Sequence, residues 1–274
     1  MDSKIIIAHR GASISHAENT LASFAAGHEG GAHLIETDVV LTRDGVAICL
    51  HDLWLDTTTD VGELFPDRAR DDGHWYAIDF DMDEIRTMTA SGRADGPSGE
   101  HRVPTFAQFL ELIDRLNKEA GRREGDVGGM GVIVEPKDPG FHMGQGRRVE
   151  DEIVKIAGER GWLDGRMIIQ SFSFDSLMYV RTLTDVPLFA LTSDGFSDAQ
   201  LDGLAGHVVG IGPERGIAER DGAALVKAAH DRGLVVYPYT FRDEPGEMRR
   251  FMHEVGVDGL FTDDPAAGIR AARG

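Results

Sequence analysis

Short apolar segments recur along the chain, and a helical pattern separates each one from the next. The expected strands cover residues 4–8, 33–38, 131–135, 166–170, 187–191, 207–211, 234–239 and 257–261. The expected helices cover residues 19–29, 105–118, 149–160, 174–183, 197–204, 219–232, 246–255 and 265–272. Parallel strands buried on both faces read as continuous apolar runs, and strands alternating with helices are typical of βα units. The sequence therefore predicts an α/β fold, a (β/α)8 or TIM barrel, with an open doubly wound sheet as the alternative.

One long segment interrupts this alternation. Residues 46–50 form an additional apolar run, and about residues 53–103 are polar and contain several glycines and prolines. A structureless loop of that length is uncommon in a compact domain. We therefore expect a single domain over residues 1–274, with a small insertion subdomain at about 53–103 that follows the second barrel strand and lies over one mouth of the barrel.

The charge of the chain limits its partners. Lysine and arginine number 28 against 47 acidic residues, which gives a formal net charge of −19. This charge disfavours nucleic acid and anionic membranes as partners, but a few local cations and a metal ion can still attract an anionic small molecule.

The sequence shows no apolar stretch of membrane-spanning length, and residues 1–8 lack the features of a signal peptide. As it stands the chain reads as cytoplasmic. A periplasmic or secreted protein whose signal peptide had been removed would read the same.

Polar side chains capable of chemistry follow the first expected strands, at the ends where barrel active sites form. Residues 4–8 lead directly into His9 and Arg10. Glu36 and Asp38 lie two residues apart in the next strand, so their side chains face the same side. Two carboxylates on one interior face repel each other unless a cation lies between them, and pairing with an arginine is the alternative.

Two further segments add the same types of residue. The run 46–50 ends in His51 and Asp52, and the next strand ends in Glu135, with Lys137 two residues later. A glutamate that ends a buried strand needs a partner or a metal ion. We therefore expect two histidines, three carboxylates and two cations to gather at one mouth of the barrel.

The order and spacing of these residues resemble the glycerophosphodiester phosphodiesterase family. The matching motifs are His9-Arg10-Gly11, Glu18-Asn19-Thr20, Glu36-Thr37-Asp38, Thr42-Arg43-Asp44-Gly45, His51-Asp52 and Glu135-Pro136-Lys137. The resemblance extends to Asp258-Gly259-Leu260-Phe261-Thr262-Asp263 and is greatest to the exported bacterial branch. Pro136 and the lack of a signal peptide depart from that pattern.

The resemblance implies a metal site and an acid/base pair. Glu36, Asp38 and Glu135 would bind one divalent cation through oxygen ligands, with Ca²⁺ favoured and Mg²⁺ as the alternative. His9 and His51 would be the general base and the general acid, respectively.

The resemblance also implies residues that bind substrate. Arg10 and Lys137 would hold the non-bridging phosphate oxygens. Glu18 would orient Arg10, with helix capping as the alternative. By its position at the end of the fourth strand, Gln170 would contact substrate, with a hydrogen bond in the barrel core as the alternative. Tyr239, at the mouth of the seventh strand, would contact the glycerol carbons, with aromatic packing at the barrel rim as the alternative.

Three other polar residues have competing interpretations. Asp52 either supports a catalytic histidine or, as favoured, stabilises its turn. Asp263 follows the last strand. For this residue, capping of the next helix together with Asp264 is favoured over a role in the site. His142 follows Glu135 closely enough to approach the site, although a structural role is favoured.

The predicted activity is hydrolysis of a glycerophosphodiester, such as glycerophosphocholine or glycerophosphoethanolamine, to sn-glycerol 3-phosphate and an alcohol. The resemblance implies that the glycerol 2-hydroxyl attacks phosphorus first and forms a cyclic phosphate, with direct attack by water as the alternative. The rival functions are a phospholipase D-like lyase on sphingomyelin or lysophospholipids, which needs an apolar groove, and a non-catalytic barrel that binds phosphodiesters. The oligomeric state is left open.

Overall fold

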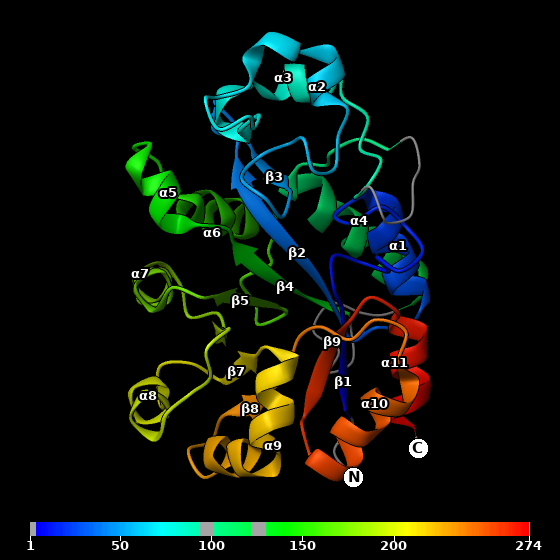
Figure 1. The fold of residues 1–274 in the computed structure, drawn as a ribbon, viewed down its shortest axis with the longest axis vertical. Helices are drawn as coiled ribbons and strands as arrows, with labels where there is room; N and C mark the ends of the chain where they lie inside the picture. The colour runs from blue at the N-terminus through cyan, green and yellow to red at the C-terminus, as the bar shows by residue number, and fades with distance from the viewer. Residues whose placement is uncertain (1–3, 94–100, 122–129, 274) are drawn as a thin grey trace.

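A nearly closed barrel of parallel strands forms the centre of the molecule in the computed structural model, which describes residues 4–93, 101–121 and 130–273. Its strands are β1 (Ile5–Ala8), β2 (Leu34–Leu41), β4 (Gly131–Pro136), β5 (Met167–Ser171), β6 (Leu188–Thr192), β7 (Gly210–Pro213), β8 (Val235–Val236) and β9 (Gly259–Thr262). They pair in the order β8-β7-β6-β5-β4-β2-β1-β9 (Figure 1). A doubly wound sheet would reverse its order partway, so the TIM-barrel prediction is confirmed and the open sheet is excluded.

Backbone contacts beyond the regular ladder bring β8 and β9 together. The amide of Asp258 donates to the carbonyl of Val236 at 3.1 Å, and the amide of Phe241 donates to that of Phe261 at 2.9 Å. Regular strand geometry covers only two residues of the predicted strand 234–239, because the chain beyond Val236 continues through isolated bridges.

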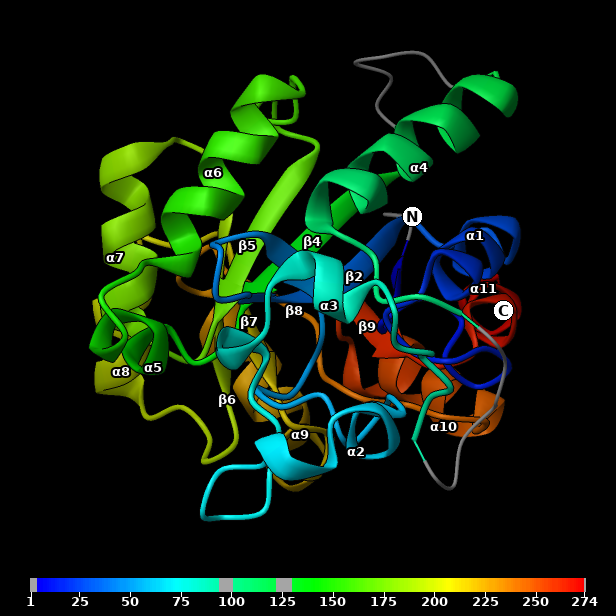
Figure 2. The same ribbon diagram turned by 90° about the horizontal axis from the view of Figure 1, so that it is seen from above.

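Helices surround the barrel, as the two perpendicular views show (Figures 1 and 2). They are α1 (Leu21–Glu29), α4 (Phe106–Glu119), α5 (Pro139–Gly144), α6 (Val149–Glu159), α7 (Phe174–Leu183), α8 (Asp198–Leu204), α9 (Arg215–His230), α10 (Pro245–Arg250) and α11 (Pro265–Ala272). The short helix α5 was not predicted, because its six residues carry no helical periodicity. In the described parts of the chain, no helix combines the length and apolarity needed to cross a bilayer.

Alternation along the strands divides the core into two layers. Ile6, Ala8, Val132 and Val134 belong to the large cluster between the strands and the helices. Between these positions lie the residues that fill the inside of the barrel, and these are Ile7, Ile133, Phe189, Tyr237 and Phe261. Because side chains alternate with a period of two, Glu135 shares the inward face of Ile133. The apolar interior of the barrel therefore stops at the carboxyl ends of the strands, where inward-facing polar side chains such as Glu135 begin.

The segment after β2 builds a second small core. Strand β3 (Ala47–Cys49) pairs antiparallel with β2, and the chain continues through α2 (Val61–Leu64), two short 3₁₀ turns and α3 (Met82–Ile85). The apolar residues of this segment cluster mainly with one another, and α2 and α3 lie together at one end of the molecule (Figure 1). This core supports our proposal of an insertion subdomain at about 53–103, of which residues 94–100 lie outside the described residues.

Gly11 lies where the loop after β1 passes against α1. Its φ is +88°, and the Cβ of any larger residue would clash with the backbone of Ser23. Gly11→Ala is expected to lower the free energy of unfolding by about 3 kcal/mol or more, measured by urea denaturation. Gly73→Ala is the matched control, since Gly73 has a φ of +86° but nothing within 4 Å of its Cβ. Equal losses in both variants would contradict the clash.

Candidate active site

Three buried carboxylates meet at the carboxyl ends of β2 and β4. Parallel pairing of these strands sets Asp38 beside Glu135, and Glu36 faces the same way as Asp38. One carboxylate oxygen from each of the three residues lies within 4.8 Å of the others. Asp38 and Glu36 are each only 1% exposed. These oxygen donors fit a hard divalent cation such as Ca²⁺ or Mg²⁺.

The carboxylates strongly affect one another's protonation. Burial and then the charge of Asp38 raise the pKa of Glu36 well above its usual value. Burial also raises the pKa of Glu135, despite the nearby Lys137 ammonium. Burial opposes ionisation of Asp38 too, but the charge of Lys137 and other cations outweighs it and lowers the pKa of Asp38. A cation bound among the three groups would relieve this repulsion.

Arg10 connects the first strand to the carboxylates. Its backbone is left-handed, with φ at 56°, and its amide donates to Glu36 Oε2 at 2.7 Å. The guanidinium Nη1 donates to Glu18 Oε1 at 2.9 Å, while Nε lies 3.3 Å from Asp38 Oδ2. The predicted contact between Glu18 and Arg10 is thus present in the structure.

Lys137 is the second cation of the site. Its Nζ donates to Glu135 Oε1 at 2.8 Å and lies 3.6 Å from Asp38 Oδ1. Burial disfavours its charge, but the adjacent carboxylates outweigh this effect and raise the pKa of Lys137. The side chain therefore stays charged at any ordinary pH.

Each of the two predicted histidines is held by an aspartate. His9 Nδ1 lies 2.8 Å from Asp263 Oδ1, and His51 Nδ1 lies 2.6 Å from Asp52 Oδ1. A carboxylate at Nδ1 keeps the proton on that atom, so the lone pair of the neutral ring is on Nε2. Burial, and next the charge of Arg10, lower the pKa of His9, which keeps this ring neutral near neutral pH.

The contacts of Asp263 change the interpretation reached from the sequence. Capping of α11 is made by Asp264, whose carboxylate accepts from the amide of Ala267, whereas Asp263 contacts His9 and Ser13. The favoured capping role for Asp263 was therefore wrong. Asp263 directly follows the last strand, as His9 follows the first, and this position was a signal for a role in the site.

Asp52 and His142 are also placed by the structure. Asp52 contacts the ring of His51, which agrees with the histidine-supporting alternative rather than the favoured turn role. His142 is buried in α5, and it does not line the cavity formed by the predicted site residues.

Arg93 is a contact of the site that sequence reasoning missed. It comes from the insertion, and its Nε donates to Glu18 Oε2 at 2.9 Å. Its Nη2 lies 3.3 Å from Asp52 Oδ2. Arg93 lies in a polar stretch 75 residues from Glu18, and no motif connects the two positions.

The predicted residues surround a small cavity of about 70 Å³ at the mouth of the barrel. All predicted site residues except Glu18 line it, and these are His9, Arg10, Glu36, Asp38, His51, Glu135, Lys137, Gln170 and Tyr239. Gln170 Nε2 lies 3.5 Å from Glu36 Oε1, and the Tyr239 hydroxyl donates to the carbonyl of Thr192 at 3.0 Å. Glu18 lies in an adjoining cavity of about 390 Å³. Polar groups from five barrel strands or their ends, and His51 after β3, thus converge.

Comparison with known proteins agrees with this arrangement. Residues 9–267 match the model of the glycerophosphoryl diester phosphodiesterase family. A glycerophosphodiester phosphodiesterase of Arabidopsis thaliana is 31% identical to this chain. The alignment covers 94% of this chain and 82% of that protein. A glycerophosphodiester phosphodiesterase of Haemophilus influenzae is 27% identical, and the alignment covers 99% of this chain and 90% of that protein. The structure of a phosphodiesterase of Oleispira antarctica in complex with the product sn-glycerol-3-phosphate has the same fold, with a TM-score of 0.77 and 21% identity. The match covers 99% of this chain and 98% of that one.

Proposed function

The chain belongs to the glycerophosphoryl diester phosphodiesterase family, and from this premise we propose how its residues hydrolyse a glycerophosphodiester. The observation that carries the proposal is the shared cavity of three buried carboxylates, two aspartate-held histidines and two cations. The proposed substrates are glycerophosphocholine, glycerophosphoethanolamine and similar diesters. The products would be sn-glycerol 3-phosphate, as in the complex of the Oleispira antarctica enzyme, and an alcohol.

Glu36, Asp38 and Glu135 would hold one divalent cation, Ca²⁺ in preference to Mg²⁺. When bound, this ion supplies positive charge that polarises the phosphoryl oxygens. The mutual repulsion of the carboxylates and the raised pKa of Glu36 support such a site.

Arg10 and Lys137 would hold the non-bridging oxygens of the phosphate. The planar guanidinium of Arg10 can make a two-pronged contact, which the ammonium of Lys137 cannot. Each cation contacts a buried carboxylate before substrate arrives, Arg10 that of Asp38 and Lys137 that of Glu135, so they need little rearrangement as charge develops on phosphorus.

His9 and His51 would move the protons. Nε2 of His9 would take the proton of the glycerol 2-hydroxyl as that oxygen bonds to phosphorus. His51 would donate a proton to the alcohol oxygen as its bond to phosphorus breaks. The resulting cyclic phosphate would then be opened by water with the two histidines in exchanged roles. A substrate that lacks the 2-hydroxyl should not be cleaved, and cleavage at the full rate would instead support direct attack by water.

The head group is tested by a turnover screen. Release of sn-glycerol 3-phosphate from glycerophosphocholine, glycerophosphoethanolamine and glycerophosphoglycerol would be followed by a coupled dehydrogenase assay. We expect release from at least one of these diesters. Phosphodiester binding without release of product would instead indicate a non-catalytic barrel.

The raised pKa of Glu36 gives a pH dependence in protein stripped of metal. The folded pKa of Glu36 lies above the ordinary value of 4.5, so its stabilising effect is complete below that pH and is lost as the pH rises through the folded pKa. We therefore expect the free energy of unfolding of chelated wild type, relative to chelated Glu36→Gln, to fall as the pH rises above the ordinary value of 4.5 and through the higher folded pKa. Urea denaturation at several pH values measures this difference. A constant difference would contradict the raised pKa.

Arg93 connects the insertion to the groups that orient Arg10 and His51. Arg93→Ala is expected to lower kcat/KM for the diester about 10- to 100-fold, because Glu18 and Asp52 lose a shared partner. Arg86→Ala is the matched control, since Arg86 pairs with the exposed Asp83 in the same insertion. Equal activity in the two variants would show that the Arg93 contacts have no role in positioning the site.

A further inference from the structure

We propose that the site favours diesters whose leaving alcohol carries an alkylammonium group, and that a pocket between α5 and the loop after β5 binds this group through Asp138, Phe141 and Phe172. This space is called the head-group pocket below. The inference rests on the proposed function, because the alcohol must leave from a substrate of that same site. The proposed hydrolysis itself requires no particular head group and assigns no residue to one.

The head-group pocket lies at the carboxyl ends of β4 and β5, beside the catalytic cavity. Its volume of about 360 Å³ is within the range of about 300–1,000 Å³ that is usual for small-molecule sites. Its lining residues are Glu135, Pro136, Lys137, Asp138, Pro139, Gly140, Phe141, Ser171, Phe172 and Ser173. Glu135, Lys137 and Phe172 also line the catalytic cavity, so an alcohol bonded to phosphorus there can extend into the head-group pocket.

His51 places the leaving alcohol on this side of the site, because in the proposed mechanism it donates the proton to that alcohol. Burial raises the pKa of Glu135, and the charges of Lys137 and His51 oppose this rise, so His51 lies near the carboxylate that borders the head-group pocket. His9, the proposed base, borders a different cavity. The alcohol therefore leaves toward the head-group pocket, while the glycerol stays beside His9.

Asp138 gives the head-group pocket its available negative charge. The residue precedes α5 with a φ of 39°, and its exposed carboxylate does not cap that helix. In the described parts of the chain, no hydrogen bond or ion pair involves this carboxylate. Lys137, by contrast, is paired with Glu135 and Asp38. A cation in the head-group pocket would therefore find an acidic partner in Asp138.

The two hydroxyls of the head-group pocket serve the backbone. Ser171 Oγ accepts a hydrogen bond from the amide of Ser173 at 3.1 Å. Ser173 Oγ caps α7 by accepting from the amide of Ser176 at 3.2 Å. A polyol head group would compete with these contacts, whereas the methyl groups of a quaternary ammonium need no hydrogen bond.

Two phenyl rings supply the apolar part of the wall. Phe141 belongs to α5, and Phe172, which is 49% exposed, lies in the loop after β5. Tyr76 stacks on Phe141 with 5.6 Å between centroids and so helps to hold that ring in place. Aromatic rings attract alkylammonium groups that lie within about 6 Å of the ring centroid. Rings beside a carboxylate therefore suit the trimethylammonium group of choline.

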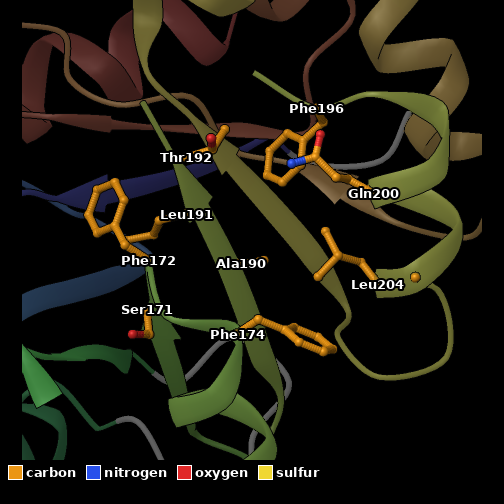
Figure 3. A pocket seen from close by; sticks show the side chains of 10 residues that line it. Ser171, Phe172, Phe174, Ala190, Leu191, Thr192, Phe196, Gln200 and Leu204 are labelled. Atoms are coloured by element: carbon orange, nitrogen blue, oxygen red, sulfur yellow. The ribbon is translucent and has the colours of Figure 1, made fainter. Parts of the chain in front are cut away.

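Two other spaces beside the catalytic cavity suit a cation less well. The cavity of about 390 Å³ that borders His9 is lined by three arginines against two carboxylates, and the arginines are Arg10, Arg93 and Arg242. The hollow along β6, where the Phe172 ring lies beside Leu191 (Figure 3), has no charged group among the described residues that line it. A cation placed there would lose water contacts without gaining a counterion.

The test compares sn-glycero-3-phosphocholine with the corresponding ester of 3,3-dimethylbutanol, in which carbon replaces the nitrogen of choline. Release of sn-glycerol 3-phosphate by the full chain is followed with a coupled dehydrogenase. We expect kcat/KM for the choline ester to be about 10-fold higher, because the carboxylate and the rings each favour the cation a few-fold. Equal or lower kcat/KM for the choline ester would overturn the inference alone, whereas lack of turnover of both would overturn the proposed function with it.

Variants separate the contribution of the head-group pocket from that of the ammonium group to the leaving ability of choline. Asp138→Asn keeps the size of the side chain, and asparagine readily adopts left-handed backbone. This variant should reduce the ratio of the two kcat/KM values about threefold. Phe141→Leu keeps an apolar side chain but removes the ring, and it should reduce the ratio by a similar factor.

Asp175→Asn is the matched control, since Asp175 is exposed in the first turn of α7 and does not line the head-group pocket. It should keep the wild-type ratio. A ratio that is unchanged in Asp138→Asn, or that falls equally in Asp175→Asn, would overturn the assignment of Asp138.

Discussion

Alanine at both Glu36 and Asp38 is expected to lower turnover of glycerophosphocholine by about 10³-fold or more. The two residues supply two of three carboxylates for the proposed cation, and loss of the ion removes several kcal/mol of charge stabilisation in the transition state. The variant also leaves Arg10 and Lys137 with fewer anionic partners. Release of sn-glycerol 3-phosphate measures turnover, and calorimetric titration with Ca²⁺ measures binding of the ion directly.

Glu150→Ala is the control for the double variant. Glu150 is as deeply buried as Glu36, but it lies in α6 and accepts a hydrogen bond from Ser176. We expect this variant to keep Ca²⁺ binding and turnover, whatever its effect on stability. Full turnover in the Glu36→Ala/Asp38→Ala protein would overturn the metal assignment.

His9→Ala and His51→Ala are each expected to lower kcat by about 10²–10⁴-fold, the usual contribution of a well-placed acid or base. Both rings have Nδ1 held by an aspartate, so Asp263→Asn and Asp52→Asn should cause smaller losses by releasing the ring orientation. Single-turnover kinetics with each variant separate the chemical step from substrate binding.

The pH profile distinguishes the base from a merely structural histidine. The pKa of His9 is lowered from 6.5, so kcat/KM should decline only below that pH as the ring becomes protonated. The residual activity of His9→Ala should lack this decline. His74→Ala is the control, because His74 Nδ1 pairs with Asp56 at 2.9 Å in the insertion, away from the cavity. Equal losses in His74→Ala and His9→Ala would refute the catalytic assignment.

The barrel was predictable because its strands are buried on both faces. Apolar runs such as 131–135 and 166–170 lie within one or two residues of β4 and β5. The prediction was less accurate where pairing is irregular, as in β8, since backbone bridges have no sequence pattern. Helix α5 was missed because a six-residue helix with little periodicity gives no signal.

The site was predictable where strand geometry alone places the residues. Glu36, Asp38 and Glu135 converge because parallel strands end at one mouth and alternate side chains face inward. Asp263 and Arg93 were not assigned, since their contacts depend on the closure of the barrel and on how the insertion folds back.

Turnover of glycerophosphocholine by metal-stripped protein tests the central claim most directly. After chelation and removal of the chelator, release of sn-glycerol 3-phosphate should fall to background, and Ca²⁺ or Mg²⁺ should restore it. Wild-type turnover in protein shown by elemental analysis to hold far less than one ion per chain would contradict the account.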